Sequence, residues 1–470
     1  MLHISSCCRG KRLSRCFGPR AFYVRALCIA LPVMLHSFIQ TGISFLDNVM
    51  VSRLGDVKMG AVNVVNSLLF LYVTALMTVS NAGSVFMTQY SGARHVVGMR
   101  QSYRFKQYAM GSLALGAMAA ALCCPQYLLS CLLGKNAQAA QIIAEGERYL
   151  SIIVYTLVPL SFSLVLTSTL RETGKVLVPL AVYGCSAVLN AVGNYMLIYG
   201  NWGAPRLEVQ GAACATLIAR VVESLMLLVY VRVKKPDFYV RLFCRCAIPL
   251  SLCTVMLRKS LWIFVGDMAW SVTEMAVAAL YHSRGGAEVV AGMSAGWTLA
   301  QLFFLSFPAS SVAITILVGD VLGKSELKQA QDYARWLMNG AFFLGLGLGV
   351  IVCVARAGIP WAFGDLSHAS QRIAQQLVLV TALYMPIWMY LNAQYAVARA
   401  GGEVMVTAWT ETLVDTLLFL PLMYVLARFT QLGAPLMYGI VKSTSVVKMV
   451  VLARHLKTRR WVRNLVANLS

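Results

Sequence analysis

Long runs of apolar residues, separated by short polar segments, dominate the pattern of this chain. Crossing the hydrocarbon core of a bilayer takes about 20 apolar residues in a helix, and a helix satisfies its own backbone hydrogen bonds there. The pattern therefore predicts an all-α membrane protein with twelve transmembrane helices, over residues 26–52, 60–90, 106–133, 149–170, 176–200, 209–232, 260–283, 288–320, 333–356, 371–398, 404–427 and 434–455.

Composition supports this class, because the 470 residues are 59% hydrophobic and only 12% charged, unlike soluble domains of this size. One further apolar stretch, residues 239–259, carries several arginines and is predicted to be an interfacial helix rather than a thirteenth span. The expected organisation is a basic cytoplasmic tail, an N-lobe, a cytoplasmic interfacial linker, a C-lobe and a basic cytoplasmic C-terminus, over residues 1–24, 25–235, 236–259, 260–456 and 457–470.

The formal net charge of +22 raises the question of nucleic-acid binding. Most of the Lys and Arg residues, however, fall in the alternate loops that share one side of the membrane with the N-terminus. This positive-inside bias predicts that both termini are cytoplasmic, and it argues against nucleic acid as a partner. Residues 1–24 lack the apolar core of a signal peptide and suit an anionic lipid surface. The 13 Cys include no C-x-x-C with a partnering His, so no metal site is expected.

The second half of the chain repeats the first. Five pairs of segments match at offsets between 227 and 231 residues: "SRLG" with "SRGG", Gly92 with Gly323, Pro159 with Pro386, "LRETGK" with "ARAGGE", and "WGAP" with "LGAP". Each half holds six predicted spans, and an even number returns the chain to the same side. The pattern therefore predicts two six-helix lobes related as a parallel repeat, an architecture suited to alternating access.

A carboxylate in the first apolar run is the leading functional candidate. A charged side chain at the bilayer centre costs about 2.5 to 3.5 kcal/mol on insertion scales, so such groups usually face a bundle interior or an aqueous cavity. Pro32, His36, Gln40 and Asp47 fall on one face of a helix. Pro32 should also bend the helix, because it lacks a backbone N–H.

Other polar residues within the spans form pairs on single helix faces. Asn190 and Asn194 are one turn apart in the fifth span, and they either complete an ion site or join helices by hydrogen bonds. The second half contributes four acids in two pairs, Asp267 with Glu274 and Glu411 with Asp415. Four carboxylates near one cavity would repel one another, so some are expected to carry protons and others to bind cations. The alternative is that each carboxyl hydrogen-bonds to a neighbouring helix.

Several segments resemble the multidrug and toxic compound extrusion (MATE) family of transporters. They occur in the family's order over about residues 25–455: "FLDNVMVSRLG", "QYSGA", "LRETGKVLVPL", "LNAVGNYMLIYGNWGAPRLEVQGAACATLIAR" and "ARAGGEVMVTAWTETLVDTLLFLPL". The resemblance implies a twelve-helix transporter of two six-helix lobes. It also implies export of mostly organic cations in exchange for inward-moving protons (H+) or sodium ions (Na+), without a cofactor.

The resemblance also assigns residues. Asp47 matches the family's first-helix acid, Asn190 and Asn194 its fifth-helix polar pair, and Thr216 its sixth-helix hydroxyl, which together form the resembled ion site. Some members carry Asp where this chain has Asn194. Asp267 and Asp415 fall where related bacterial members also carry acids. The tenth span lacks the acid of the sodium-type C-lobe site, so such a site is not expected here.

The tenth span offers aromatic and amide side chains instead, which suit either flat cations or core packing: Tyr384, Trp388, Tyr390, Asn392 and Tyr395. The sequence thus predicts a secondary active multidrug efflux transporter, monomeric, in the cell inner membrane, with organic cations and the lipid bilayer as partners. The sequence contains no Walker loop, so ATP is not the expected energy source. The alternatives are a lipid-linked saccharide flippase of the same superfamily, which needs a cationic cleft, and a membrane-embedded enzyme or receptor without transport.

Overall fold

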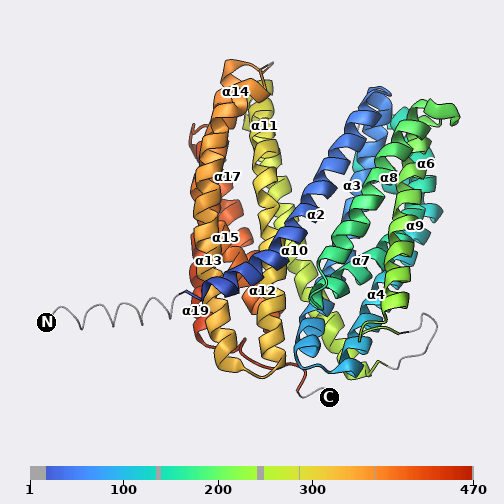
Figure 1. Ribbon diagram of the computed structural model, residues 1–470. Coiled ribbons are helices and arrows are strands. Elements are labelled where there is room, and N and C mark those ends of the chain that lie inside the picture. The colour runs from blue at the N-terminus through green and yellow to red at the C-terminus, as the bar shows by residue number, and fades with distance from the viewer. Residues whose placement is uncertain (1–16, 134–138, 241–247, 285, 365, 468–470) are drawn as a thin grey trace. The chain divides into compact units, whose positions relative to one another are not determined.

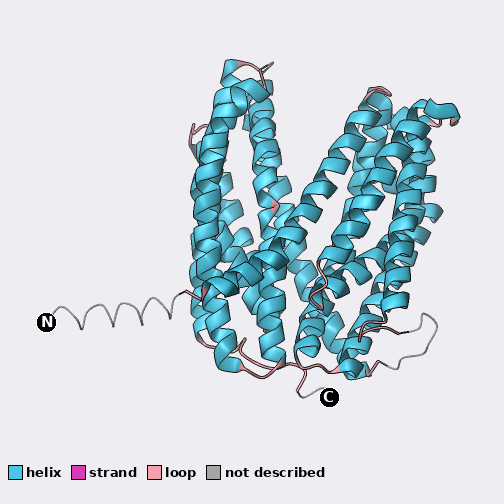
Figure 2. Ribbon diagram, viewed as in Figure 1, coloured by secondary structure: helices cyan, strands magenta, loops and turns pink. Residues whose placement is uncertain are grey.

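Helices make up the whole regular structure of the described chain. The computed structural model describes residues 17–133, 139–240, 248–284, 286–364 and 366–467. Within these ranges every regular element is helical and no strand occurs (Figure 1, Figure 2). This confirms the predicted all-α class and follows from the apolar runs, because helices satisfy backbone hydrogen bonds without water.

The first half of the chain provides six spans. Their bounds are α2 (Arg20–Ser52), α3 (Asp56–Gly92), α4 (Val96–Cys123) with α5 (Pro125–Leu133), α6 (Ala139–Ile153) with η1 (Val154–Thr156) and α7 (Leu157–Glu172), α8 (Leu177–Tyr199) and α9 (Glu208–Lys234). A short turn, η2 (Asn201–Gly203), separates the last two spans.

The second half provides six more spans. Their bounds are α10 (Leu250–Arg284), α11 (Ala287–Phe304) with α12 (Ser306–Gly323), α13 (Leu327–Ala355) with η3 (Arg356–Gly358) and α14 (Ile359–Ala362), α15 (His368–Ala400), α16 (Val404–Val414) with η4 (Asp415–Phe419) and α17 (Leu420–Phe429), and α18 (Ala434–Lys442) with α19 (Thr444–Lys457). The predicted twelve-helix, two-lobe architecture is confirmed.

Most of these spans are apolar enough to cross a bilayer on composition alone. In the described ranges ten helical stretches meet that criterion, and α4 with α5, which meet at an angle of 91°, make an eleventh. The twelfth, α10, falls outside the criterion and contains Arg258, Lys259, Asp267 and Glu274. The charged groups that weaken the apolar signal of α10 include two of the predicted site residues.

The predicted interfacial helix over residues 239–259 does not form as a separate element in its described part. Residues 241–247 lie outside the described ranges. From Leu250 onwards the chain is one continuous helix with the predicted seventh span, because no proline interrupts the run to Arg284. The helix therefore begins ten residues earlier than the predicted start at residue 260.

The two halves turn in the same way at corresponding positions. Arg94 follows α3 with φ 53°, and Ser325, 231 residues later, follows α12 with φ 61°. Gly174 follows α7 and Gly402 follows α15, both with φ 82°. A positive φ is uncommon outside glycine, so its recurrence at matching offsets is strong evidence for the predicted repeat.

Backbone hydrogen bonds repeat with the same spacing. His95 N donates to Tyr90 O at 3.0 Å in the first half, and Glu326 N donates to Val321 O at 3.2 Å in the second. These bonds close the ends of the second and eighth spans, where helix carbonyls would otherwise lack partners.

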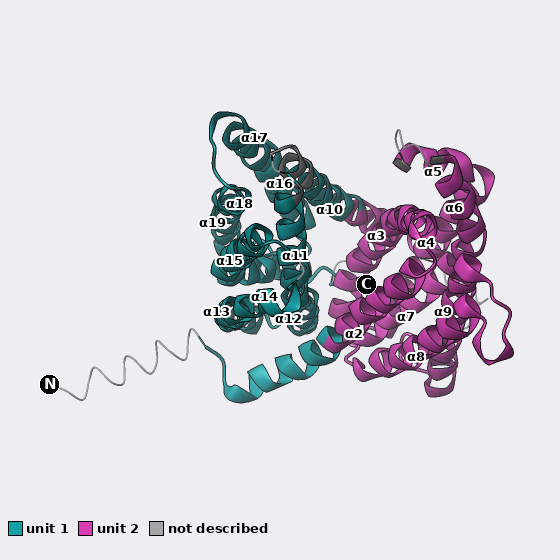
Figure 3. Ribbon diagram, turned by 90° about the horizontal axis from the view of Figure 1, so that it is seen from above, with its two compact units in different colours: residues 1–34, 261–469 teal, residues 35–260, 470 magenta. Residues whose placement is uncertain are grey.

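The chain forms two compact units, which Figure 3 colours separately. Unit 2 contains residues 35–260, and unit 1 contains residues 261–469 together with the first 34 residues. The division differs from the predicted N-lobe, which began at residue 25. The reason is that Phe22 and Tyr23 of α2 pack on α13: the Phe22 and Trp336 ring centroids are 5.3 Å apart, and Tyr23 Oη donates to Trp336 O at 3.2 Å.

Helix α15 is central in unit 1, where it packs against α11, α12, α13, α18 and α19. Its closest neighbour is α13, on which Gly345 and Gly349 face α15. A Cβ at Gly345 would lie 2.7 Å from Pro386 Cα, and a Cβ at Gly349 would lie 2.6 Å from Ala382 O. Small residues let membrane helices approach this closely, and so fix α15 and its polar side chains in place.

Candidate functional site

Unit 2 brings the four residues of the predicted ion site together. Asn194 Nδ2 on α8 donates to Asp47 Oδ1 on α2 at 2.6 Å. Asn194 Nδ2 also lies 3.4 Å from Asn190 Oδ1, and Asn190 Nδ2 donates to Thr216 Oγ1 on α9 at 3.2 Å. The spacing of one turn between the two asparagines places both amides on the face of α8 that meets α2 and α9.

A small cavity of about 50 Å³ adjoins these groups, enough for an ion or one water molecule. Asp47, Asn190 and Thr216 line it, together with Tyr183 and Arg220. Asn194 is fully buried, and in the described chain its Oδ1 atom has no hydrogen-bond partner. The Asn194 amide thus donates a hydrogen bond to the Asp47 carboxylate and has an unsatisfied oxygen, which is a type of atom that small cations bind.

The arginine that lines this cavity, Arg220, also forms an ion pair. Arg220 Nη1 pairs with Glu223 Oε2 at 2.8 Å, and its guanidinium lies 5.7 Å from the Tyr183 ring centroid. Among the ion pairs formed by described residues, none includes Asp47. The Asp47 carboxylate is therefore held by a neutral amide, beside an arginine that is already paired.

The other residues of the predicted polar face of the first span do not join the small cavity. The His36 ring lies 4.3 Å from the Tyr183 ring, measured between centroids, and is partly buried. Gln40 is exposed, and neither side chain lines the small cavity. Pro32 is buried inside α2, which continues through it without a break. The division between the two units falls two residues later, between Met34 and Leu35.

Unit 1 contains a much larger cavity, of about 690 Å³, between α10, α11, α12, α15, α16, η4, α18 and α19. Aromatic rings form much of its wall, and acidic, basic and amide groups interrupt them. The polar lining includes Glu274, Gln301, Asn392, Glu411, Asp415, Lys442 and Lys448, and the aromatic lining includes Trp270, Trp297, Phe304, Phe307, Trp388, Tyr395, Phe419 and Tyr438. Volume and composition are those of a small-molecule site.

The acids in this cavity are paired with lysines, which the analysis of the sequence did not foresee. Lys442 Nζ lies 2.6 Å from Glu274 Oε1. Lys448 Nζ bridges two carboxylates, at 2.9 Å from Glu411 Oε1 and 2.6 Å from Asp415 Oδ1. Ammonium groups thus lie beside all three of these carboxylates and offset part of the repulsion that was expected among them.

The fourth acid of the second half lies apart. Asp267 Oδ1 is 3.8 Å from Arg399 Nη2, both side chains are about one-third exposed, and neither lines the large cavity. The cavity thus holds three carboxylates and two ammonium groups, a formal charge of −1. That balance does not provide the cationic cleft that a pyrophosphate-linked saccharide requires.

A π-helix places one of these acids. Residues 415–419 form η4, between α16 and α17, and both Asp415 and Phe419 from it line the cavity. Pro421, just after η4, has no N–H to donate to the preceding turn, which accounts for the wider turn. Single π-turns inside α-helices occur frequently at functional sites.

The predicted residues of the tenth span divide into two sets. Trp388, Asn392 and Tyr395 line the large cavity. Tyr384 Oη instead donates to Gly439 O at 2.8 Å, and the Tyr390 ring packs edge-on against Phe342, with 6.3 Å between centroids. Three of the five side chains are therefore positioned to contact a ligand.

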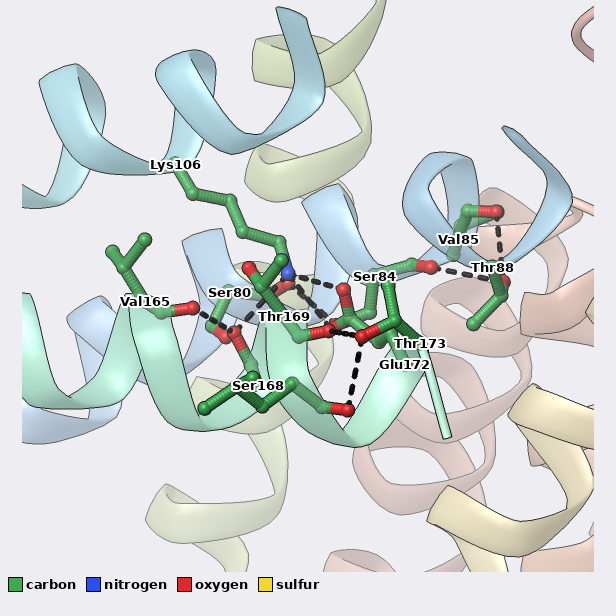
Figure 4. Close-up of polar contacts among 11 residues, drawn as sticks. Ser80, Ser84, Val85, Thr88, Lys106, Val165, Ser168, Thr169, Glu172 and Thr173 are labelled. Atoms are coloured by element: carbon green, nitrogen blue, oxygen red, sulfur yellow. Dashed lines mark hydrogen bonds and ion pairs between the residues drawn. The ribbon is translucent and has the colours of Figure 1, made fainter. Parts of the chain in front are cut away.

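A buried ion pair in unit 2, between Lys106 and Glu172, was not predicted from the sequence (Figure 4). Lys106 Nζ of α4 lies 2.7 and 2.6 Å from the two carboxylate oxygens of Glu172 on α7, and 3.1 Å from Ser168 Oγ. Ser84 Oγ also donates to Glu172. At Gly83 a Cβ would come within 2.6 Å of Lys106 Cγ, so glycine makes room for the lysine.

The predicted bounds of the third span concealed this pair. The predicted third span began at residue 106, which put Lys106 at a membrane edge. The helix in fact begins at Val96, so the lysine lies inside it, and its side chain is fully buried. A buried lysine in a membrane helix calls for a partner, and Glu172 is that partner.

In the part of the chain that the structure describes, no group of three or more His, Cys, Asp and Glu side chains is arranged to hold a metal ion. The oxygens around Asp47 are hard donors, which suit a proton or Na+ rather than a soft transition metal.

Comparisons with known proteins agree with these features. A family model described as MatE matches residues 32–196 and 246–425. The chain is 26% identical over 361 residues to the multidrug resistance protein NorM of Vibrio vulnificus, covering 76% of this chain and 77% of that one. It is 23% identical over 416 residues to a probable multidrug resistance protein NorM of Bacillus licheniformis, covering 87% of this chain and 89% of that one.

A solved structure shares the fold. The crystal structure of a protein named MATE, in a bent conformation, superposes with a TM-score of 0.83 over 93% of this chain and 95% of the other, at 17% identity. At that identity the likeness establishes the fold and leaves the chemistry to the residues of this chain.

Proposed function

Because the chain belongs to the MATE family of transporters, we propose that it is a secondary active multidrug efflux transporter that exchanges organic cations for H+ or Na+. Membership makes the chain a membrane transporter rather than an enzyme. The relatives named as multidrug resistance proteins support a broad range of organic substrates.

The observation that carries the ion-exchange proposal is the environment of Asp47. Its carboxylate accepts a hydrogen bond from the neutral Asn194 amide, beside an unsatisfied Asn194 oxygen, and no described ion pair neutralises it. A carboxylate in that setting gains from binding a proton or a Na+ ion, because burial makes an uncompensated charge costly.

The proposed cycle links this ion to the substrate. A proton or Na+ entering from the outer side binds at Asp47, and the hydrogen bonds to Asn194 and Asn190 rearrange. Repacking of α2 at Pro32 then weakens the hold on the organic cation, which leaves outward. Release of the ion to the cytoplasm resets the transporter for the next substrate, which shifts the population between two states.

The concentration gradient of the coupling ion drives this exchange. Because one charge moves inward while the organic cation carries one charge outward, a one-for-one exchange is electroneutral, and each tenfold ion gradient supplies about 1.4 kcal/mol, enough for a tenfold substrate gradient. We further propose that the protein acts as a monomer in the cell inner membrane with both termini in the cytoplasm, as the positive-inside bias indicates.

The test is efflux from proteoliposomes that contain the purified full-length protein. Ethidium export is measured under an imposed pH gradient and then under an imposed Na+ gradient. The expected result is export driven by one of the two, which identifies the coupling ion. Export driven by neither gradient would remove ion exchange.

A matched pair of variants locates the ion site. Asp47→Asn should abolish gradient-driven export, because an amide neither binds a proton nor carries charge. Asp56→Asn, at an exposed acid where α3 begins, should leave export unchanged. Equal export by both variants would contradict the assignment of Asp47.

A further inference from the structure

The ammonium group of Lys442 lies inside a cluster of aromatic rings in the large cavity of unit 1. Its Nζ atom is 5.0 Å from the Phe419 ring centroid, 5.1 Å from that of Tyr438 and 6.0 Å from that of Trp388. The same Nζ also pairs with Glu274 Oε1 at 2.6 Å. Several aromatic faces and one carboxylate around a cation are the arrangement that recognises organic ammonium groups.

The rings are held by contacts that do not involve Lys442. Trp388 Nε1 donates to Ser445 Oγ at 3.2 Å, and its ring stacks on Tyr384 with 5.6 Å between centroids. Tyr384 in turn donates to the backbone of Gly439. The position of Trp388 is therefore fixed before any cation arrives.

The other two rings belong to the packed core of the unit. Tyr438 is 1% exposed and packs edge-on against Trp297, with 5.8 Å between centroids. Phe419 is 3% exposed and sits in η4 within the same hydrophobic cluster. Since all three rings are fixed independently, the cage that they form with Glu274 would persist without the lysine.

The second lysine of the cavity provides the contrast. Lys448 bridges Glu411 and Asp415, and the aromatic contacts of cations found among the described residues do not include it. It neutralises two carboxylates, whereas Lys442 combines one carboxylate with three rings. The two lysines thus share a cavity but have different surroundings.

We propose that Trp388, Phe419, Tyr438 and Glu274 form a binding subsite for organic ammonium groups, and that Lys442 occupies it as a tethered competitor. A substrate that carries a quaternary or alkylated ammonium displaces the Lys442 ammonium, takes over the contact with Glu274 and gains the three ring faces. Lys442 therefore sets a threshold for entry, because only cations that bind the cage better than lysine does are retained. The inference rests on the proposed export of organic cations for the identity of the substrate, but not for binding itself.

Lys442→Met tests this directly, because methionine keeps the apolar stem of the side chain and removes its charge. The probe is choline, titrated calorimetrically into the purified full-length protein in detergent without any ion gradient. Opening the cage should tighten choline binding by about tenfold, as cation–π contacts and a freed carboxylate become available to it. The uncharged isostere 3,3-dimethylbutan-1-ol should show no such gain.

Matched variants separate the cage from general electrostatics. Lys448→Met makes the same change of charge in the same cavity, so any gain there should stay within about twofold. Adding Glu274→Gln or Phe419→Leu to Lys442→Met should remove the gain. Equal tightening by Lys442→Met and Lys448→Met, or none by Lys442→Met, would overturn the proposal and leave Lys442 as a structural ion-pair partner.

Two further arms keep the outcome decisive. Should Lys442→Met fail to fold, Phe419→Leu and Trp388→Leu in the unaltered chain should weaken choline binding, and unchanged affinity would refute the cage. Asp56→Asn, at an exposed acid that does not line the large cavity, should bind choline as the unaltered chain does. If the unaltered chain exports ethidium but Lys442→Met binds choline no more tightly, the cage alone is refuted. If Lys442→Met binds choline more tightly but the unaltered chain shows no gradient-driven export, the ion-exchange proposal alone is refuted.

Discussion

The acids of the two units are stabilised in opposite ways. In unit 2, Asp47 is held by the neutral Asn194 amide, and its nearest arginine pairs with Glu223. In unit 1, Glu411 and Asp415 share the ammonium of Lys448. A carboxylate held by an amide can change its charge state without breaking an ion pair, whereas a carboxylate held by lysine cannot.

The difference fits the two tasks proposed above for the two cavities. The cavity at Asp47 has room for little more than one water, about 50 Å³, and the cavity of unit 1 is about 690 Å³ and walled by aromatic rings. Small size with a carboxylate that a neutral amide holds suits the proposed coupling ion. Large size with compensated charges suits an organic guest. Removing one charged group from each setting should change stability to different degrees.

The largest loss of stability is expected at the buried pair of unit 2. Lys106→Met leaves the Glu172 carboxylate without its cation, and the side chains of the pair are 0% and 6% exposed. Such a change should lower the free energy of unfolding by about 3–5 kcal/mol, seen as a fall in Tm in detergent.

Two companions bracket this result. Lys58→Met, at the more exposed pair with Glu208, should change Tm little. Lys106→Met with Glu172→Gln should recover much of the loss. A small effect of Lys106→Met alone would show that water reaches this pair.

The next largest loss is expected in the cavity of unit 1. Lys448→Met leaves Glu411 and Asp415 uncompensated, but the cavity lets water solvate them, so the expected loss is about 2–3 kcal/mol. Thermal unfolding measures it, and Lys448→Met with Asp415→Asn should be more stable than the single variant. No recovery in the double variant would mean that Lys448 stabilises by packing instead.

A smaller loss is expected at Asp267. Its partner Arg399 is 3.8 Å away and partly exposed, so Arg399→Gln should cost about 0.5–1 kcal/mol. The same thermal measurement applies, with 1 M salt as the comparison, because screening should reduce the difference between Arg399→Gln and the unaltered chain. A loss that salt does not affect would point to lost packing of the arginine stem.

The smallest change of stability is expected at the ion site itself. Asp47→Asn keeps an oxygen to accept the hydrogen bond from Asn194 and removes a partly buried charge, so Tm should stay constant or rise, within about 0.5 kcal/mol. Transport should nevertheless be lost. A large fall in Tm would show that the Asp47 carboxylate holds the helices together and would weaken its assignment to ion exchange.

Much of this arrangement was predictable from local pattern. The apolar runs predicted the spans, and helical spacing placed Asn190 and Asn194 on one face. Pairing between distant residues was not predictable, since Lys448 and Glu411 are 37 residues apart and Lys442 and Glu274 are 168 apart. No periodicity links such positions, and only the folded structure brings them together.

Misjudged helix ends caused the remaining misses. Starting the third span at Lys106 hid a buried lysine, and ending the linker at residue 259 divided α10 in two. Charged residues near the ends of a span lower its mean hydropathy. A span predicted from hydropathy is therefore too short, and it excludes charged residues that lie inside the real helix and need a partner there.

The matching turns at Arg94 and Ser325 extend beyond the repeat itself. An arginine and a serine share neither size nor charge, yet both adopt the same uncommon backbone conformation 231 residues apart. Duplication has thus preserved torsion angles where it has not preserved side chains. A comparison of backbone dihedral angles should therefore align the two halves residue for residue, including at positions where their amino-acid sequences show no similarity.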